Sequence, residues 1–330
     1  MKKLTSVFLT AMLAASLTAC SQGSSGQGDD SRVINIAVIK QLDHASLDEI
    51  ANAITGELDA LAKANNVTIK YTVDSGQNDP TTLQQFAAQY VSSGVDAIIP
   101  IATLAAQTMT SAAEEKQIPV VYAAISDPEG ASLTGFDNVT GTSDALNTKV
   151  IMDMMFDQNP AIKTVGLLYS MSEPNSEKPI AEAKAYLDAK KIAYVEATGN
   201  TNDEIAQAVS SLVASKVDAV FTPTDNVVMA TELVTAQTLA EAGIPHYTGA
   251  DSFVRNGAFT TCGVNYTELG KKTADLAYQA VTSGMADMED YYLMDGGIVT
   301  VNTETAADLK ADYSMFSKYG EIVEVTTTEN

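Results

Sequence analysis

The run Val95-Asp96-Ala97-Ile98-Ile99-Pro100 follows Gly94 and a helical pattern, and it is typical of a short strand buried on both faces. A matching run, Val217-Asp218-Ala219-Val220-Phe221-Thr222, stands 122 residues later (217 minus 95). A second pair, Gln117-Ile118-Pro119-Val120 and Gly243-Ile244-Pro245-His246, repeats at an offset of 126 (243 minus 117). The two similar offsets predict two lobes of the same topology, with chance similarity between common strand–helix units as the alternative.

Outward from these runs, strand-like segments alternate with longer segments of helical period. In the first half we expect strands at 33–39, 67–73, 95–100 and 118–124, and helices at 45–64, 80–94 and 102–116. In the second half we expect strands at 164–169, 192–197 and 217–221, and helices at 144–156, 180–190, 203–214 and 266–282. Repeated strand–helix crossovers require a parallel sheet with helices on both faces. The predicted fold class is α/β, with two doubly wound parallel-sheet lobes.

The composition supports a globular protein that does not bind nucleic acid. The chain has 330 residues, of which 45% are hydrophobic, so it can bury a large core. It carries 19 Lys plus Arg against 42 Asp plus Glu, which gives a net charge of −23. Because this charge repels phosphate backbones, nucleic acid is excluded as an expected partner.

The N-terminus has the pattern of an export signal. A positive start, Met1-Lys2-Lys3, precedes a short apolar run at 7–15 that is too short to be a stable membrane span. The quartet Leu17-Thr18-Ala19-Cys20 resembles the bacterial lipobox, which implies a signal peptide at 1–19 and a lipid on Cys20. The Gly-, Ser- and Gln-rich segment 20–31 then predicts a flexible tether. The alternative is an ordinary signal peptide with an incidental cysteine.

Signals for catalysis, cofactors or metals are weak. The sequence has no Gly-x-Gly-x-x-Gly after the first strand, no Walker loop and no Gly-x-Ser-x-Gly motif. His44 and His246 are the only histidines, so a histidine-based zinc site or hydrolytic triad is hard to assemble. Cys262 lies in a strand-like run and is expected to be a buried, inert thiol. We therefore expect no cofactor, no metal and no enzymatic activity.

Ligands of open parallel sheets bind beyond the carboxyl ends of the strands, where helices begin. In this chain those ends carry short polar residues, at 41–44, 101–103 and 126–128 in the first half and at 172–176, 222–226 and 249–252 in the second. Hydroxyl and amide groups suit a carboxylate, while Asp127, Asp225 and Asp251 could share an ammonium, so the set predicts an amino acid as ligand. The same residue types also form ordinary helix caps, which is the alternative for each of them. Aromatic residues near these ends could pack a ligand side chain: His44, Phe136, Tyr169, Phe253 and Tyr266.

Several motifs together resemble the solute-binding lipoproteins of bacterial ABC importers, in particular the group linked to tryptophan and tyrosine uptake. In the first half these motifs are residues 43–48 (DHASLD), 101–107 (IATLAAQ), 126–128 (SDP) and 138–141 (NVTG). In the second half they are 173–176 (EPNS), 223–226 (PTDN) and 255–258 (RNGA). The resemblance implies a type I periplasmic-binding-protein fold, in which two lobes joined by three crossings close on a small solute, and in which the last helix rejoins the first lobe.

The resemblance also implies domain boundaries and site residues. The first lobe would comprise 32–141 plus 264–285 and the second 142–263 plus 286–330, with hinges near 140–143, 257–264 and 285–291 and a cleft between the lobes. The ligand-binding positions that the resemblance implies are His44, Thr103, Ser126, Asp127, Asn175, Ser176, Asp225, Asn226 and Asp251. The partners would be an amino acid with an aromatic side chain, an ABC permease and, through lipid only, the membrane. We expect a monomer outside the cytoplasm.

Three alternatives stay open at this stage. The same fold could bind a sugar, nucleoside or peptide, although carbohydrate sites favour stacking tryptophans and this chain has none. An enzyme of the extracytoplasmic surface would need an activated nucleophile, a metal cluster or a cofactor loop. The effector module of a transcription factor would carry a basic DNA-binding start in place of the signal and tether.

Overall fold

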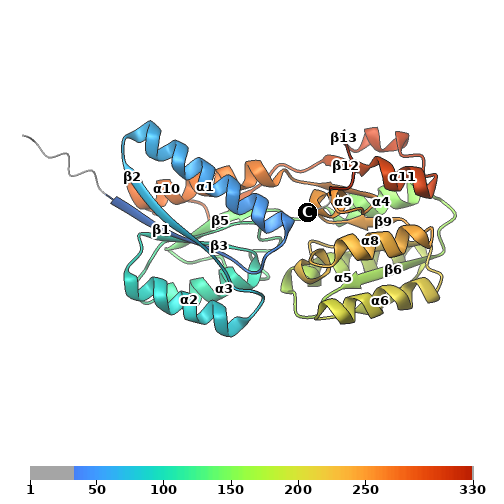
Figure 1. Cartoon of the computed structure of the whole chain (residues 1–330), viewed down its shortest axis with the longest axis horizontal. Coiled ribbons are helices and arrows are strands. Elements are labelled where there is room, and N and C mark those ends of the chain that lie inside the picture. Colours follow the sequence, from blue (N-terminus) through green and yellow to red (C-terminus); the bar gives the residue numbers. More distant parts are fainter. Residues whose placement is uncertain (1–32, 329–330) are drawn as a thin grey trace, which may run out of the picture. The chain divides into compact units, whose positions relative to one another are not determined.

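The computed structural model describes residues 33–328, which contain two sheets flanked by helices (Figure 1). The expected signal peptide, the lipidation residue Cys20 and the tether lie outside the described residues. The first sheet has all its strands parallel. Its strands, in spatial order, are β11 (Tyr292–Leu293), β5 (Val139–Ser143), β4 (Val120–Tyr122), β3 (Ala97–Ile101), β1 (Val33–Lys40) and β2 (Thr68–Ser75).

The second sheet repeats this order. Its strands are β13 (Glu321–Val325), β12 (Ile298–Asn302), β10 (Thr260–Gly263), β9 (His246–Thr248), β8 (Ala219–Thr222), β6 (Thr164–Tyr169) and β7 (Ala193–Thr198). All neighbours are parallel except β10 and β12, where Thr260 faces Val301 in an antiparallel pair. The series β5-β4-β3-β1-β2 corresponds strand by strand to β10-β9-β8-β6-β7. The predicted fold class, two doubly wound α/β lobes, is confirmed.

Helices cover both faces of these sheets. They are α1 (Ala45–Asn65), α2 (Pro80–Ser93), α3 (Thr103–Ala113), α4 (Thr148–Gln158), α5 (Pro174–Lys190), α6 (Asn202–Ala214), α7 (Asn226–Met229), α8 (Glu232–Glu241), α9 (Asp251–Arg255), α10 (Tyr266–Ser283), α11 (Thr303–Leu309) and the 3₁₀ turn η1 (Ser314–Lys318). Local sequence sets their ends; for example, Asp79 caps α2, Pro80 opens it and Gly94 closes it in the left-handed region. Among residues 33–328, no helix is long and apolar enough to cross a membrane.

Side chains of β1 alternate between the two faces of the sheet and pack against a different helical layer on each face. Ile34, Ile36 and Val38 belong to the core under α1 and α10, whereas Ala37 and Ile39 belong to the core under α2 and α3. Figure 1 shows α1 and α10 side by side. Gly270 permits their close approach, because a methyl group there would stand 2.6 Å from Cβ of Ala53 and 2.7 Å from the Ile50 carbonyl oxygen.

Within the described part, the chain passes between the two sheets three times. The first passage comes after β5, at residues 144–147. The second comes after β10, at 264–265, and the third after β11, at 294–297. The third lies later than the expected hinge at 285–291, because Tyr292 and Leu293 still pair with Thr142 and Ser143 of the first sheet. The segment 292–293 therefore joins the first sheet, although it lies in the range that we assigned to the second lobe. The other domain boundaries stay a prediction.

Candidate functional site

A cavity lies between the two sheets, at the carboxyl ends of their strands. It is lined by His44, Ser46, Leu47, Ala102, Thr103, Ala124, Ser126, Asp144 and Tyr266 from the first lobe and its crossings, and by Asn175, Thr224, Asp225, Asn226, Met229, Ala250 and Phe253 from the second. The strand order reverses between β1 and β3 and again between β6 and β8, and ligands of open α/β sheets bind at such points. The cavity volume is about 20 Å³, which is room for about one water molecule.

The first lobe contributes helix starts to this cavity. His44 stands immediately before α1, and Thr103 is the first residue of α3. Ala102 and Ala124, which also line the cavity, have φ angles of 76° and 57°. This left-handed backbone is strained for residues other than glycine, and such strain concentrates at functional sites. The surrounding structure therefore holds the backbone at these two alanines in conformations that are unfavourable for alanine.

The second lobe holds its side of the cavity through Asp225. One carboxylate oxygen of Asp225 accepts from the backbone N–H groups of Val227 (3.1 Å) and Val228 (3.0 Å) at the start of α7. The other accepts from the Ser170 N–H and the Ser176 hydroxyl, both at 2.7 Å. Burial raises the pKa of Asp225, and these four donors oppose that shift. Asp225 therefore joins the loop after β6 to the loop after β8.

Direct hydrogen bonds cross from one lobe to the other. Nε2 of Gln41 donates to Oε1 of Glu173 at 2.6 Å, and the hydroxyls of Ser126 and Thr224 lie 3.0 Å apart. The hydroxyls of Ser46 and Ser252 also form a hydrogen bond. Because both partners of each pair are buried or partly buried, separation of the lobes would break these contacts and hydrate the groups. The structure is therefore a closed arrangement of the lobes.

A chain of side chains connects His44 with Glu173 across this interface. Nδ2 of Asn226 donates to Oε2 of Glu173 at 2.6 Å, and Oδ1 of Asn226 lies 3.0 Å from Nε2 of His44. Burial lowers the pKa of His44 to about 4, so its ring is neutral at neutral pH. Burial, with the nearby charge of Asp225, raises the pKa of Glu173 to about 8. Asn226 thus separates two titratable groups without being charged itself.

Asp144, which the sequence analysis did not select, lies in the cavity wall. Its two carboxylate oxygens accept from the Ser126 hydroxyl at 2.9 Å and from the Tyr266 hydroxyl at 3.0 Å. Burial raises the pKa of Asp144. Each carboxylate oxygen can accept a further hydrogen bond, so Asp144 can still bind a donor from a ligand. Its position directly after β5 follows the rule of strand ends, but the run Val139–Ser143 has too little apolar character to be recognised as a strand.

Two polar atoms of the cavity have no hydrogen-bond partner among the described residues. They are Nδ1 of His44 and Oδ1 of Asn175, and both are buried. The Asn175 amide is oriented by its Nδ2, which donates to the Thr224 carbonyl oxygen at 2.7 Å. Because buried polar atoms are almost always hydrogen-bonded in proteins, unpartnered ones in a cavity wall indicate contacts made to a ligand or to water.

The structure places six of the nine expected binding residues in the cavity wall: His44, Thr103, Ser126, Asn175, Asp225 and Asn226. Ser176 lies behind the wall, bonded to Asp225. Asp127 lines an adjoining hollow of about 370 Å³ and stands 3.6 Å from Nζ of Lys178. Asp251 accepts from Arg255 within α9, at 3.2 Å.

The three aspartates that we expected to share an ammonium are therefore not brought together. Asp225 caps α7, and Asp127 and Asp251 each face a cation of their own. Each occupies the first turn of a helix or a tight turn, where a carboxylate satisfies backbone N–H groups or neighbouring charges. The alternative stated for them, ordinary caps, describes Asp225 correctly. Asp144 is the carboxylate that has spare acceptor capacity in the cavity.

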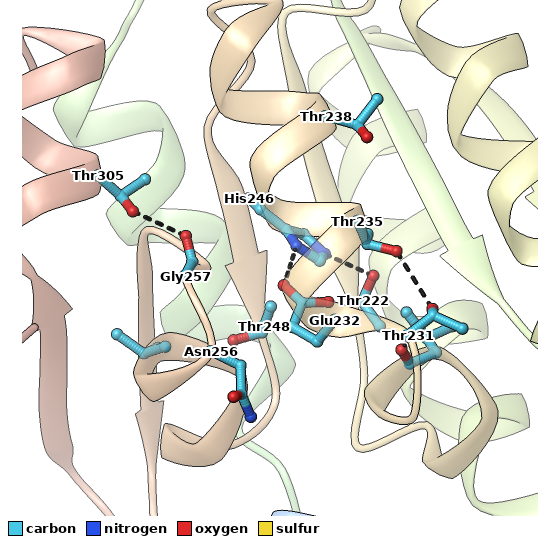
Figure 2. A network of polar contacts seen from close by, with 12 residues as sticks. Thr222, Thr231, Glu232, Thr235, Thr238, His246, Thr248, Asn256, Gly257 and Thr305 are labelled. Carbon is cyan, nitrogen blue, oxygen red and sulfur yellow. Dashed lines mark hydrogen bonds and ion pairs between the residues drawn. The ribbon is translucent and has the colours of Figure 1, made fainter. Parts of the chain in front are cut away.

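The second histidine has a different environment. Figure 2 shows His246 between Glu232 and Thr222: its Nδ1 lies 2.9 Å from Oε1 of Glu232 and its Nε2 lies 2.7 Å from the Thr222 hydroxyl. His246 and Glu232 are 2% and 1% exposed, so this is a buried pair. Burial raises the pKa of Glu232, and His246 opposes the shift. The pair joins α8 to β9 inside the second lobe, His246 also contacts Thr222 at the end of β8, and neither residue of the pair lines the cavity.

The family model for the ABC transporter substrate binding protein matches residues 35–314. The chain belongs to this family. A tyrosine-binding protein of Clostridioides difficile (strain R20291) is 30% identical over 317 residues, covering 92% of this chain and 91% of the relative. The resemblance inferred from the motifs is confirmed, and the relatives point to a binding role rather than an enzymatic one.

Two solved structures of similar sequence, one with a ligand and one without, can be compared with this protein. An ABC domain from Streptococcus pneumoniae in complex with L-Trp superposes with a TM-score of 0.80 at 28% identity, covering 89% of this chain and all of that one. The ligand-free, open structure of a substrate-binding protein with adhesive properties from Clostridium difficile gives 0.65, also at 28% identity and with the same coverage. The closer match to the ligand-bound structure agrees with the hydrogen bonds that join the lobes here.

Proposed function

We propose that this substrate-binding protein is the extracytoplasmic receptor of an ABC importer and that it captures an amino acid, with an aromatic side chain preferred. The observation that carries the proposal is the set of acceptors in the cavity wall. Nδ1 of His44, Oδ1 of Asn175 and the carboxylate of Asp144 can all accept hydrogen bonds from an ammonium group.

The same wall offers groups for the rest of an amino acid. The hydroxyls of Thr103 and Thr224 and the start of α3 suit a carboxylate, because helix N-termini carry free N–H groups and a partial positive charge. Phe253, Met229 and Leu47 supply apolar surface for the side chain. The relative that is named for tyrosine binding and the structure solved with L-Trp support an aromatic ligand.

Lobe closure is the working step of this proposal. The closed cavity of about 20 Å³ is too small for an aromatic amino acid, so the lobes must separate for the ligand to enter. The three passages between the sheets are short, and they are the places where the backbone can bend. Closure removes water from the cavity, which strengthens charge-assisted hydrogen bonds to the ligand.

We further propose that a lipid on Cys20 anchors the receptor, that a permease accepts the ligand from it, and that it works as a monomer. These statements rest on the lipobox-like sequence at 17–20 and on family membership. Labelling with radioactive palmitate tests the anchor. The wild type should incorporate label and sediment with membranes, whereas the Cys20→Ser variant should do neither.

The ligand is tested on protein purified without added ligand and then unfolded. Because the chain has no tryptophan, indole fluorescence in this material comes from bound ligand alone, and mass spectrometry identifies it. Calorimetric titration should then show one site for L-tryptophan or L-tyrosine, with weaker binding of L-alanine and no binding of glucose. Stabilisation by a sugar, nucleoside or peptide without a response to amino acids would refute the proposal. Turnover of the ligand, in place of its retention, would indicate an enzyme.

A further inference from the structure

We propose that Nδ1 of His44 is the acceptor for the ligand's ammonium group, and that Glu173 of the opposite lobe sets this role by fixing the His44 proton on Nε2 through Asn226. This inference rests on the proposed function, because it assigns one contact of an amino-acid ligand. His44 would touch the ligand. Glu173 and Asn226 would be positioning residues that act through His44.

The orientation of Gln41 fixes one end of the chain of hydrogen bonds. Oε1 of Gln41 accepts from the backbone N–H of Leu104 at 3.0 Å, and an N–H group can only donate. Nε2 of Gln41 is therefore the group that faces Oε1 of Glu173, at 2.6 Å. Oε1 of Glu173 thus accepts a hydrogen bond from Gln41, which belongs to the first lobe.

The second oxygen of Glu173 sets the direction of the remaining bonds. As a carboxylate it accepts from Nδ2 of Asn226, so Oδ1 of Asn226 faces His44. An amide oxygen can only accept, which requires a proton on Nε2 of His44. Since burial keeps the ring neutral, Nδ1 then carries a lone pair and no proton. This is the atom that has no partner among the described residues and lines the cavity.

Two other residues of the cavity wall make the cavity suitable for a positive group. Oδ1 of Asn175 is an acceptor because Nδ2 of the same amide donates to a carbonyl oxygen. Asp144 is a carboxylate with unused acceptor capacity. Three acceptors in one small cavity favour an ammonium, which has three N–H groups, over a carboxylate, which has none.

Closure of the lobes creates this acceptor. His44 and Gln41 belong to the first lobe, whereas Asn226 and Glu173 belong to the second, so the four side chains meet only when the lobes are together. In the open form His44 would be hydrated, and either ring nitrogen could carry its proton. The ammonium of a ligand would therefore be recognised by the closed form and would favour closure.

The Glu173→Gln variant reverses the chain of donors. The amide introduced at position 173 can accept from Gln41 with its oxygen, so its NH₂ group must face Asn226, whose own amide then turns. Nδ2 of Asn226 would donate to Nε2 of His44, and the ring proton would move to Nδ1. A donor would then face the ligand's ammonium. The size of the side chain at this position is unchanged, so lost packing cannot mimic this effect.

The test compares L-tyrosine with 3-(4-hydroxyphenyl)propanoate, which lacks only the amino group, in calorimetric titrations of the purified full chain. It is done at pH 8.5, because the pKa of Glu173 is about 8 and the carboxylate then prevails. The ratio of the two affinities should fall at least about 10-fold in Glu173→Gln. It should not change in Glu182→Gln, a matched substitution at an exposed position of α5.

Nitrogen-15 spectra of the histidine rings give an independent readout. The chain has two histidines, and the signals that vanish in His44→Asn belong to His44. With L-tyrosine bound at pH 8.5, we expect the proton on Nε2 in the wild type and on Nδ1 in Glu173→Gln. A proton on Nδ1 in the wild type, or equal affinity ratios in wild type and Glu173→Gln, would overturn this inference and leave the proposed function standing. Failure of the wild type to bind any amino acid would overturn both.

Discussion

The two histidines of this protein show two uses of a buried glutamate. Glu232 contacts His246 directly, at 2.9 Å, and both ring nitrogens of His246 have partners inside the second lobe. Glu173 acts on His44 through the amide of Asn226, across the two lobes, and one ring nitrogen is left facing the cavity. A direct contact stabilises the fold, because it pairs two groups that would be costly to bury alone. An interposed amide transmits an orientation and leaves the ring available to a ligand.

The largest expected effect concerns the direct pair. His246→Ala leaves Glu232 buried without its partner, and we expect the free energy of unfolding to fall by about 3–5 kcal/mol. His44→Ala removes a half-buried ring at a helix start and should cost about 1 kcal/mol or less. Urea denaturation of the ligand-free proteins measures both. Similar losses in the two variants would show that the two environments do not differ as described.

A pH titration sharpens the comparison. Because the pKa of His44 is lowered to about 4 in the closed form, that form binds fewer protons than the open form between about pH 4 and 6.5. The contribution of His44 to ligand affinity is therefore complete above about pH 6.5 and falls as the pH is lowered, by roughly 10–30-fold at pH 5. This loss is measured relative to His44→Asn, which keeps an acceptor but cannot titrate. Because Glu173 titrates in both proteins, its contribution cancels. Parallel pH profiles would contradict the role given to His44.

A smaller effect is expected at the cavity carboxylate. Asp144→Asn should weaken binding of an amino acid by about 10-fold, because a charge-assisted hydrogen bond to the ammonium becomes a neutral one. Asp127→Asn is the matched control, since Asp127 faces Lys178 in the adjoining hollow. It should change affinity less than about 3-fold. If Asp127→Asn is the more damaging variant in calorimetry, the site extends into that hollow and Asp144 is not its main acceptor.

The smallest effect is expected for the ion pair between the lobes. Nζ of Lys178 stands 3.6 Å from Oδ1 of Asp127, and the Lys178 side chain is 53% exposed. Exposed pairs of this kind contribute about 0.5 kcal/mol, so Lys178→Ala, like Asp127→Asn, should change ligand affinity less than about 3-fold. The change should shrink further in 0.5 M salt. A loss larger than that of Asp144→Asn would show that this pair, rather than the buried chain from Gln41 to His44, holds the lobes together.

Much of the fold could be predicted from the sequence, because buried helices and strands place their apolar residues at regular intervals. The matching runs at 95–100 and 217–222 became β3 and β8, which occupy the same place in the two sheets. Several boundaries were missed for local reasons. The helix expected at 144–156 begins at Thr148, because Asp144 belongs to the cavity and Asn147 caps the helix. The weakly apolar strand β5 was not foreseen, and Asp144 was missed with it.

The cavity was only partly predictable. Six of the nine residues that the family resemblance implies lie in the wall. The rule of strand ends marks the same segments, because the carboxyl ends of parallel strands meet at one edge. It could not tell which carboxylates would be used internally, as Asp225 is by four donors. Nor could it pair Gln41 with Glu173, since these residues are 132 positions apart and meet only through the packing of two lobes. Contacts of that kind leave no periodic pattern in a single sequence.

The close packing of α1 on α10 bears on how this receptor could change its ligand. Gly270 leaves no room for a methyl group between the two helices, so they pack closely at this point. His44 precedes the first and Tyr266 begins the second, so both side chains stand at the ends of this packed pair of helices. A larger or smaller guest must then be accommodated from the opposite side, at Met229 or Phe253. Adaptation of this scaffold to new ligands would therefore occur mainly through substitutions in the second lobe.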